Sequence, residues 1–121
     1  MDKVLIIDDS AFARSKTRRI FEKNGYAVIE ADSGEKGLEL VKQENPDLVT
    51  LDLLMPGLSG METLMKLKTL SPDLKVIVVT ADIQDKTREE MENAGVAAFL
   101  NKPLNEAELL NTIQKIVGKK S

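Results

Sequence analysis

Five short apolar segments recur along the chain, and a helix-like segment follows each of them. The apolar runs have the length of β-strands and lie at 3–8, 26–31, 47–52, 75–80 and 97–101. Two of them contain VLII and VIVV, which are continuously apolar, as expected of strands covered on both faces of a parallel sheet. The segments between the runs carry apolar residues at helical spacing. This alternation predicts a doubly wound α/β fold with a five-stranded parallel sheet and helices on both faces.

Capping signals and prolines set the expected helix ends. Ser33 is a candidate N-cap for the second helix, and Pro46 ends that helix because the residue before a proline avoids helical geometry. The third helix is expected to stop before Pro72. Gly95 supplies the left-handed conformation that commonly follows a helix. The fifth helix is predicted to end at Gly118.

Composition narrows the chemistry that is open to this chain. Its 121 residues include no cysteine and no histidine, which excludes a disulfide framework and a thiolate metal site and removes the commonest general base. The net charge is −3 and neither half is strongly basic, so we expect no direct binding to nucleic acid. The apolar runs are too short to span a membrane, and no signal-peptide pattern is present. We therefore expect one cytoplasmic domain over residues 1–121, without an effector domain.

Polar residues follow the apolar runs at the edge where the carboxyl ends of parallel strands meet. The first run ends in Asp8 and Asp9, the third in Asp52, the fourth in Thr80, and Lys102 follows the fifth. Ligands bind at this edge of an open α/β sheet. Two carboxylates about 4 Å apart repel each other by roughly 4 kcal/mol at an effective dielectric constant near 20, and a hard divalent cation relieves that repulsion. Lys102 and Thr80 suit phosphate oxygens, so the set predicts metal-assisted phosphoryl transfer onto an aspartate.

The order of four motifs adds a family resemblance to this interpretation. IIDDS, LDLLMPGLSG, VTA and FLNKP, in this order and spacing, resemble the receiver domain of bacterial response regulators, especially the stand-alone CheY-like proteins. The resemblance covers nearly the whole chain. It implies a flavodoxin-like (βα)5 fold with strand order 2-1-3-4-5. It also implies that Asp52 accepts a phosphoryl group from a phosphohistidine on a sensor histidine kinase or a phosphotransfer protein.

The resemblance assigns a metal site to the acidic residues. Asp9 and Asp52 would bind Mg2+ or Mn2+ directly, together with the backbone carbonyl of Leu54. Asp8 would act on the ion largely through water. The expected cofactor is therefore one divalent cation.

The resemblance also assigns phosphate-binding and switch roles. Lys102, Thr80 and Ala81 would contact the phosphoryl group. Thr80 would swing toward it, and Phe99 would follow into the space that Thr80 vacates. The Lys102–Pro103 peptide bond would be cis, as proline permits.

Three positions depart from the pattern that is best known in the family. Phe99 stands where tyrosine is commoner, which removes a hydroxyl from the output surface. Leu54 is apolar and Asp82 is acidic, two residues after Asp52 and Thr80 respectively. These two positions are expected to tune dephosphorylation, Leu54 by shielding the phosphoaspartate and Asp82 by orienting or repelling a water molecule.

The implied partners are proteins. Phosphorylation would change the affinity of the face formed by the fourth helix, fifth strand and fifth helix for a downstream protein target, with chemotaxis-type signalling as the expected pathway. A phosphatase is a further expected partner. We expect a monomer or a phosphorylation-dependent dimer. The protein would be a phosphoacceptor that assists its own phosphorylation and dephosphorylation, and not an enzyme with a separate substrate.

Alternatives remain at this point. Taken singly, the aspartates could cap helices or turns, Lys102 could be a solvated charge, and Thr80 could be an ordinary strand residue; Ser10 is expected to cap a helix. A receiver fold could also serve as a phosphorylation-independent interaction domain. A haloacid dehalogenase-type phosphatase requires a second aspartate where Leu54 stands, and a flavodoxin requires a glycine-rich first loop that DDSAFAR lacks.

Overall fold

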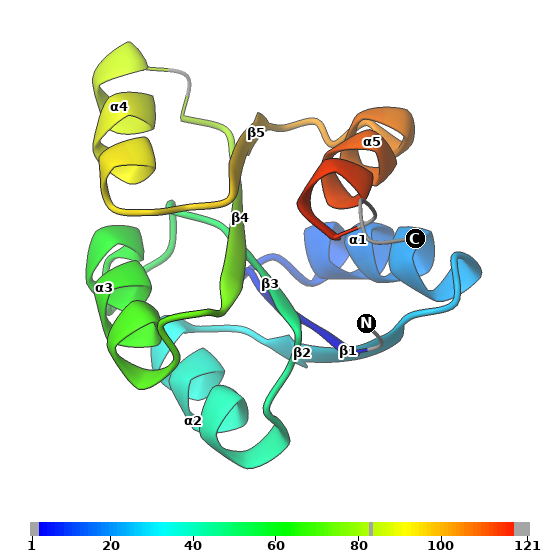
Figure 1. Ribbon diagram of the computed structural model, residues 1–121, viewed down its shortest axis with the longest axis horizontal. Coiled ribbons are helices and arrows are strands. Elements are labelled where there is room, and N and C mark those ends of the chain that lie inside the picture. Colours follow the sequence, from blue (N-terminus) through cyan, green and yellow to red (C-terminus); the bar gives the residue numbers. More distant parts are fainter. Residues whose placement is uncertain (1–2, 83, 118–121) are drawn as a thin grey trace.

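The computed structural model describes residues 3–82 and 84–117, in which strands and helices alternate as predicted (Figure 1). In chain order the elements are β1 (Lys3–Ile7), α1 (Ala11–Lys23), β2 (Ala27–Ala31), α2 (Gly34–Glu44), β3 (Leu48–Leu51), α3 (Gly60–Leu70), β4 (Lys75–Thr80), α4 (Asp85–Asn93), β5 (Ala98–Asn101) and α5 (Glu106–Val117). Each strand end lies within one residue of its predicted position. Gly118, where the sequence predicts the end of α5, lies outside the described residues. Across residues 3–82 and 84–117, every helix is too short or too polar to span a bilayer.

All strand pairs are parallel, and the sheet order is β2-β1-β3-β4-β5, which confirms the predicted topology. In the register, Ile7 pairs with Leu51 and Thr80 pairs with Asn101. The backbone N–H of Asp52 donates a hydrogen bond to the carbonyl of Ile7 (3.0 Å). The residues that follow β1, β3, β4 and β5 therefore meet at one edge of the sheet.

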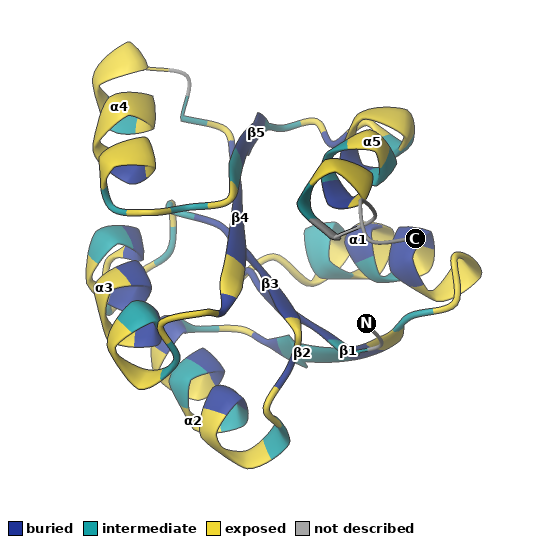
Figure 2. Ribbon diagram, viewed as in Figure 1, coloured by how far each residue is buried: buried dark blue, intermediate teal, exposed yellow. Residues whose placement is uncertain are grey.

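The core forms two apolar layers, one on each face of the sheet. Figure 1 shows α1 and α5 on one side and α2, α3 and α4 on the other, and Figure 2 shows the central strands buried between them. Alternate residues of β1 belong to different layers: Leu5 and Ile7 pack with α2, α3 and α4, whereas Val4 and Ile6 pack with α1 and α5. This two-sided burial explains why VLII is continuously apolar.

The predicted capping residues are confirmed. The Ser10 hydroxyl accepts a hydrogen bond from the N–H of Ala13 (3.1 Å) at the start of α1, and the Ser33 hydroxyl accepts one from the N–H of Lys36 (3.1 Å) at the start of α2. α2 ends before Pro46 with Asn45 in the left-handed conformation. These caps fix where the loops at the carboxyl edge of the sheet give way to helices.

A partly buried ion network joins α1 to β2, one of the two edge strands of the sheet. Glu30 accepts hydrogen bonds from Arg14 (Nε, 2.8 Å) and from Arg18. The hydrogen bond from Arg18 lowers the pKa of Glu30, burial opposes that shift, and the hydrogen bond from Arg14 adds to the lowering. Arg14 also donates to the backbone carbonyl of Asp8 (2.7 Å), so the network borders the carboxyl edge of the sheet.

Glu30→Gln should lower the free energy of unfolding at pH 7 by about 1 kcal/mol, because it removes charge-assisted hydrogen bonds to two arginines. The folded-state pKa of Glu30 lies below 4.5, so its stabilisation is present above that pH and is lost as the pH falls through the folded-state pKa. Urea unfolding at several pH values should show the two proteins converging below pH 4.5. Glu22→Gln is the control, since within residues 3–82 and 84–117 Glu22 forms an ion pair with one arginine, Arg18, and is exposed. Equal losses in both variants would contradict the prediction.

Candidate functional site

Three carboxylates converge at the carboxyl edge of the sheet. Asp8 and Asp9 follow β1, Asp52 follows β3, and one carboxylate oxygen of each lies within 4.8 Å of the others. Asp8 and Asp52 are nearly inaccessible to solvent, with 6% and 5% exposed, whereas Asp9 is exposed. The convergence predicted from the strand ends is therefore confirmed.

The two buried carboxylates are oriented by the loops that carry them. One oxygen of Asp52 (Oδ1) accepts a hydrogen bond from the N–H of Leu54 (3.0 Å), and one oxygen of Asp8 (Oδ1) accepts from the N–H of Ser10 (2.9 Å). In each case the aspartate side chain accepts from the N–H two positions further along the chain, which forms the local turn that aspartate commonly adopts. Both side chains are thus fixed before any ligand arrives.

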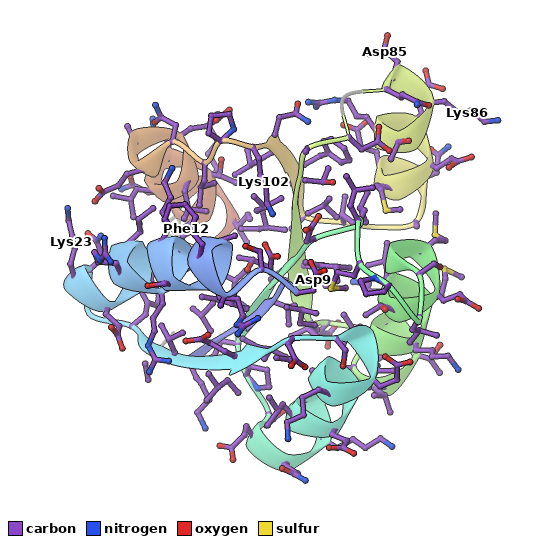
Figure 3. All side chains as sticks on the ribbon, turned by 180° about the vertical axis from the view of Figure 1, so that it is seen from behind. Asp9, Phe12, Lys23, Asp85, Lys86 and Lys102 are labelled. Carbon is purple, nitrogen blue, oxygen red and sulfur yellow. The ribbon has the colours of Figure 1, made fainter. Side chains whose placement is uncertain are left out.

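Lys102 joins the two buried carboxylates through their remaining oxygens. Its ammonium nitrogen lies 2.8 Å from Oδ2 of Asp8 and 3.1 Å from Oδ2 of Asp52. Burial favours a lower pKa for Lys102, but the hydrogen bonds to Asp8 and Asp52 outweigh it and raise the pKa above its usual value. The Lys102 side chain is therefore a positively charged ammonium group at the centre of the site. In Figure 3, Lys102 and Asp9 lie at the same end of the sheet.

The charges in this cluster do not balance. Three carboxylates face one ammonium group, which leaves an excess of two negative charges. Among the described residues, no side chain or N–H group pairs with the carboxylate of Asp9. An all-oxygen donor set with excess negative charge fits a hard divalent cation. The acidic pocket of Asp8, Asp9 and Asp52 can therefore hold a divalent metal ion.

Thr80 and Asp82 lie beside this cluster at the end of β4. Thr80 is fully buried, and its hydroxyl accepts a hydrogen bond from the N–H of Asp82 (3.2 Å). The two oxygens of Asp82 accept from the N–H of Gln84 (3.0 Å) and the hydroxyl of Thr87 (3.0 Å). Asp82 thus contacts the start of α4, an interaction that the sequence did not predict. Ala81, between Thr80 and Asp82, is exposed.

The end of β5 supplies the remaining predicted residues. Phe99 is buried in the layer that contains α4, and the peptide bond between Lys102 and Pro103 is cis, as expected. Asn101 donates from its amide to the backbone carbonyls of Thr80 (3.3 Å) and Asp82 (3.0 Å), which ties β5 to the loop after β4. The sequence hint for this role is that Asn101 stands between two predicted site residues, Phe99 and Lys102.

Two further residues, Leu54 and Arg88, bear on the site. The side chain of Leu54 is 54% exposed beside Asp52, where an approaching water molecule would meet it, and the metal-binding role of its carbonyl stays a prediction. The guanidinium of Arg88 lies 4.9 Å from the centroid of the Phe99 ring. Sequence reasoning missed Arg88, because nothing in its local pattern distinguishes it from other charges on a solvated helix face.

Comparison with known proteins places these observations in one family. The family model described as response regulator receiver domain matches residues 4–114. The sporulation initiation phosphotransferase F of Bacillus subtilis (strain 168) is 32% identical over 120 residues, which are 99% of this chain and 97% of that protein. The chemotaxis protein CheY of the same organism is 34% identical over 117 residues, which are 96% of this chain and 98% of that protein.

A solved structure agrees with this result. The crystal structure of the CheX-CheY-BeF3-Mg+2 complex from Borrelia burgdorferi contains a chain that matches with a TM-score of 0.91 and 30% identity. The match covers 95% of this chain and 88% of that chain. The similarity therefore extends over nearly the whole chain.

Lys102→Met should lower the free energy of unfolding in metal-free buffer by about 3 kcal/mol, because it leaves Asp8 and Asp52 buried without their cation. Chemical denaturation in the presence of a chelator measures the change. Lys3→Met is the matched control: Lys3 pairs with Glu44 at 3.1 Å, but both side chains are more than a third exposed, at 35% and 41%. That pair should be worth less than about 1 kcal/mol. A loss from Lys102→Met no larger than the control's would show that Lys102 does not stabilise the cluster.

Proposed function

This chain belongs to the response regulator receiver family, and on that premise we propose that it is a phosphorylation-activated switch of a two-component system. Asp52 accepts the phosphoryl group from a phosphohistidine on a sensor histidine kinase or a phosphotransfer protein. One observation carries the proposal: Asp52 is a buried, pre-oriented carboxylate that shares Lys102 with Asp8 and has an oxygen within 4.8 Å of an oxygen of Asp8 and of Asp9.

The transfer needs one bond to form and one to break. A carboxylate oxygen of Asp52 forms a bond to phosphorus while the phosphorus–nitrogen bond of the donor breaks. The bonding electrons stay with the donor imidazole, which takes up a proton from solvent. Lys102 lies 3.1 Å from Asp52, where the phosphoryl oxygens arrive, so its ammonium group can leave the two carboxylates and stabilise the charge of the transferred group.

A divalent cation, Mg2+ or Mn2+, completes the site in this proposal. Asp9, Asp52 and the backbone carbonyl of Leu54 would hold it directly, and Asp8 through water. When bound, the ion neutralises the excess negative charge of the pocket and that of the phosphoryl oxygens. The presence of BeF3 and Mg2+ with the related CheY chain of Borrelia burgdorferi supports this choice of ligands.

The signal leaves the site through Thr80 and Phe99. Phosphorylation adds a charge of about −2 to Asp52 and shifts an equilibrium between two conformations. The Thr80 hydroxyl moves toward the phosphoryl group, and Phe99 moves into the space beside it. The face of α4, β5 and α5 then changes its affinity for a downstream protein. Leu54 and Asp82 set the rate at which water removes the group, Leu54 through its exposed side chain.

A donor protein must reach Asp52 across the surface next to it. Phe12, at the start of α1, is 81% exposed, the largest exposed fraction among the large apolar side chains of the described residues. With Lys102 and Pro103 it lines a hollow of about 280 Å3. Figure 3 shows Phe12 and Lys102 on the same side of the molecule. An exposed aromatic ring on a hollow that Lys102 also lines fits the phosphohistidine-bearing protein as its occupant.

The same premise bears on the signalling pathway and on one alternative function. We infer chemotaxis-type signalling, supported by the likeness to the Bacillus subtilis chemotaxis protein CheY. A phosphorylation-independent interaction domain is the alternative. The presence of Asp8, Asp9, Asp52, Thr80 and Lys102 together argues against it, because a purely structural receiver does not require this set.

Incubation with acetyl phosphate and Mg2+ should add one phosphoryl group to the protein, measured by intact mass. Asp52→Asn should abolish the adduct, since an amide is not a nucleophile of this kind, and a chelator should suppress it. Phe12→Ala should keep full labelling, because a small donor does not need the protein-docking surface. An adduct that persists in Asp52→Asn would assign the acceptor elsewhere. The absence of both an adduct and any response to BeF3 with Mg2+ would favour the phosphorylation-independent alternative.

A further inference from the structure

α4 is held to the rest of the molecule by few contacts. Met91 is its one buried residue, and its N-cap, Gln84, makes no side-chain capping hydrogen bond. Figure 1 shows α4 beside β5 at a corner of the sheet, and Figure 2 shows that most of its surface is exposed. A helix with so little buried apolar surface can shift at low cost, so individual side-chain contacts weigh heavily on its position.

Arg88 makes one such contact, with Phe99 of β5. Its guanidinium carbon lies 4.9 Å from the ring centroid, within the range of a cation–π interaction. The Phe99 side chain is otherwise buried in the core, with 7% exposed, so Arg88 covers the part of this residue that faces α4. Among the described residues, the other charged partner of Arg88 is Glu92, at 3.8 Å on the same helix.

The surrounding contacts identify the state in which Arg88 covers Phe99. Lys102 is bound to Asp8 and Asp52, and the hydroxyl of Thr80 accepts from the N–H of Asp82. Both arrangements belong to a site without a phosphoryl group, since that group would compete for Lys102 and for the Thr80 hydroxyl. The contact between Arg88 and Phe99 is therefore a feature of the resting conformation.

We propose that Arg88 is a positioning residue that latches Phe99, and with it α4, in the resting conformation. The inference rests on the proposed function, in which Phe99 moves toward Thr80 on phosphorylation. That movement takes the ring away from the guanidinium, so the interactions of the phosphoryl group must offset the broken cation–π interaction. Arg88 thereby sets how far the unphosphorylated protein is biased against activation.

The test is the affinity of the protein for BeF3 at saturating Mg2+, measured by calorimetry or amide chemical shifts. Arg88→Gln removes the cation with little change in helix propensity. An exposed cation–π contact corresponds to about a two- to fivefold change in an equilibrium constant, so Arg88→Gln should bind BeF3 about two- to fivefold more tightly than the wild type. Glu92→Gln removes the same ion pair and leaves Arg88 over Phe99, so its affinity should equal that of the wild type.

A double-mutant cycle isolates the cation–π interaction from other effects of the substitution. In a Phe99→Leu background, Arg88→Gln should no longer change the affinity, because leucine has no π face. Arg88→Lys keeps a cation and should fall between Arg88→Gln and the wild type. Unchanged or weaker BeF3 binding by Arg88→Gln, or an equal gain in the Phe99→Leu background, would refute the latch. If wild-type protein does not bind BeF3 with Mg2+ at all, the proposed function fails first and the latch fails with it.

Discussion

The contact between Lys102 and two buried carboxylates is the interaction on which the site depends. Asp8 and Asp52 are almost inaccessible to solvent, and each would be costly as an isolated charge. Lys102 bonds to both, and the turns after β1 and β3 orient the remaining oxygens. Asp9 then adds a negative charge that the described protein groups do not neutralise. The molecule thus keeps an excess of negative charge at the carboxyl edge of its sheet that a divalent cation can neutralise.

The sheet topology is what brings these charges together. The register of β1 with β3 puts Asp8 beside Asp52, although 44 positions separate them in the sequence. β5 brings Lys102 to the same edge. Each residue follows an apolar strand that is fixed by burial on both faces. A cluster of like charges lowers stability, and a continuous core on both faces of the sheet offsets that cost. The arrangement is typical of functional sites, which sacrifice stability for activity.

The sequence predicts the fold and the acidic cluster well because both follow from periodicity and topology. Asp52 ends one apolar run and Lys102 directly follows another, and parallel strands must bring such ends together. Contacts that depend on the orientation of a helix relative to the sheet cannot be predicted from periodicity or topology. The spacing of charges around Arg88 predicts a solvated helix face, yet the position of α4 puts its guanidinium over Phe99. The role of Asp82 in tuning dephosphorylation stays a prediction, but the hydrogen bonds of its oxygens to Gln84 and Thr87 depend on the loop conformation and could not be predicted from the sequence.

The most direct test of this account is the dependence of the free energy of unfolding on Mg2+ concentration. If the acidic cluster holds the ion in the folded state alone, the free energy of unfolding should rise with Mg2+, by about 2.7 kcal/mol at a concentration one hundred times the dissociation constant. Asp9→Asn should reduce this rise strongly, because Asp9 is exposed and contributes an unpaired oxygen donor. Asp32→Asn, an exposed carboxylate after β2 outside the cluster, should keep it. A stability that does not respond to Mg2+, or the same response in Asp9→Asn as in the wild type, would contradict the account.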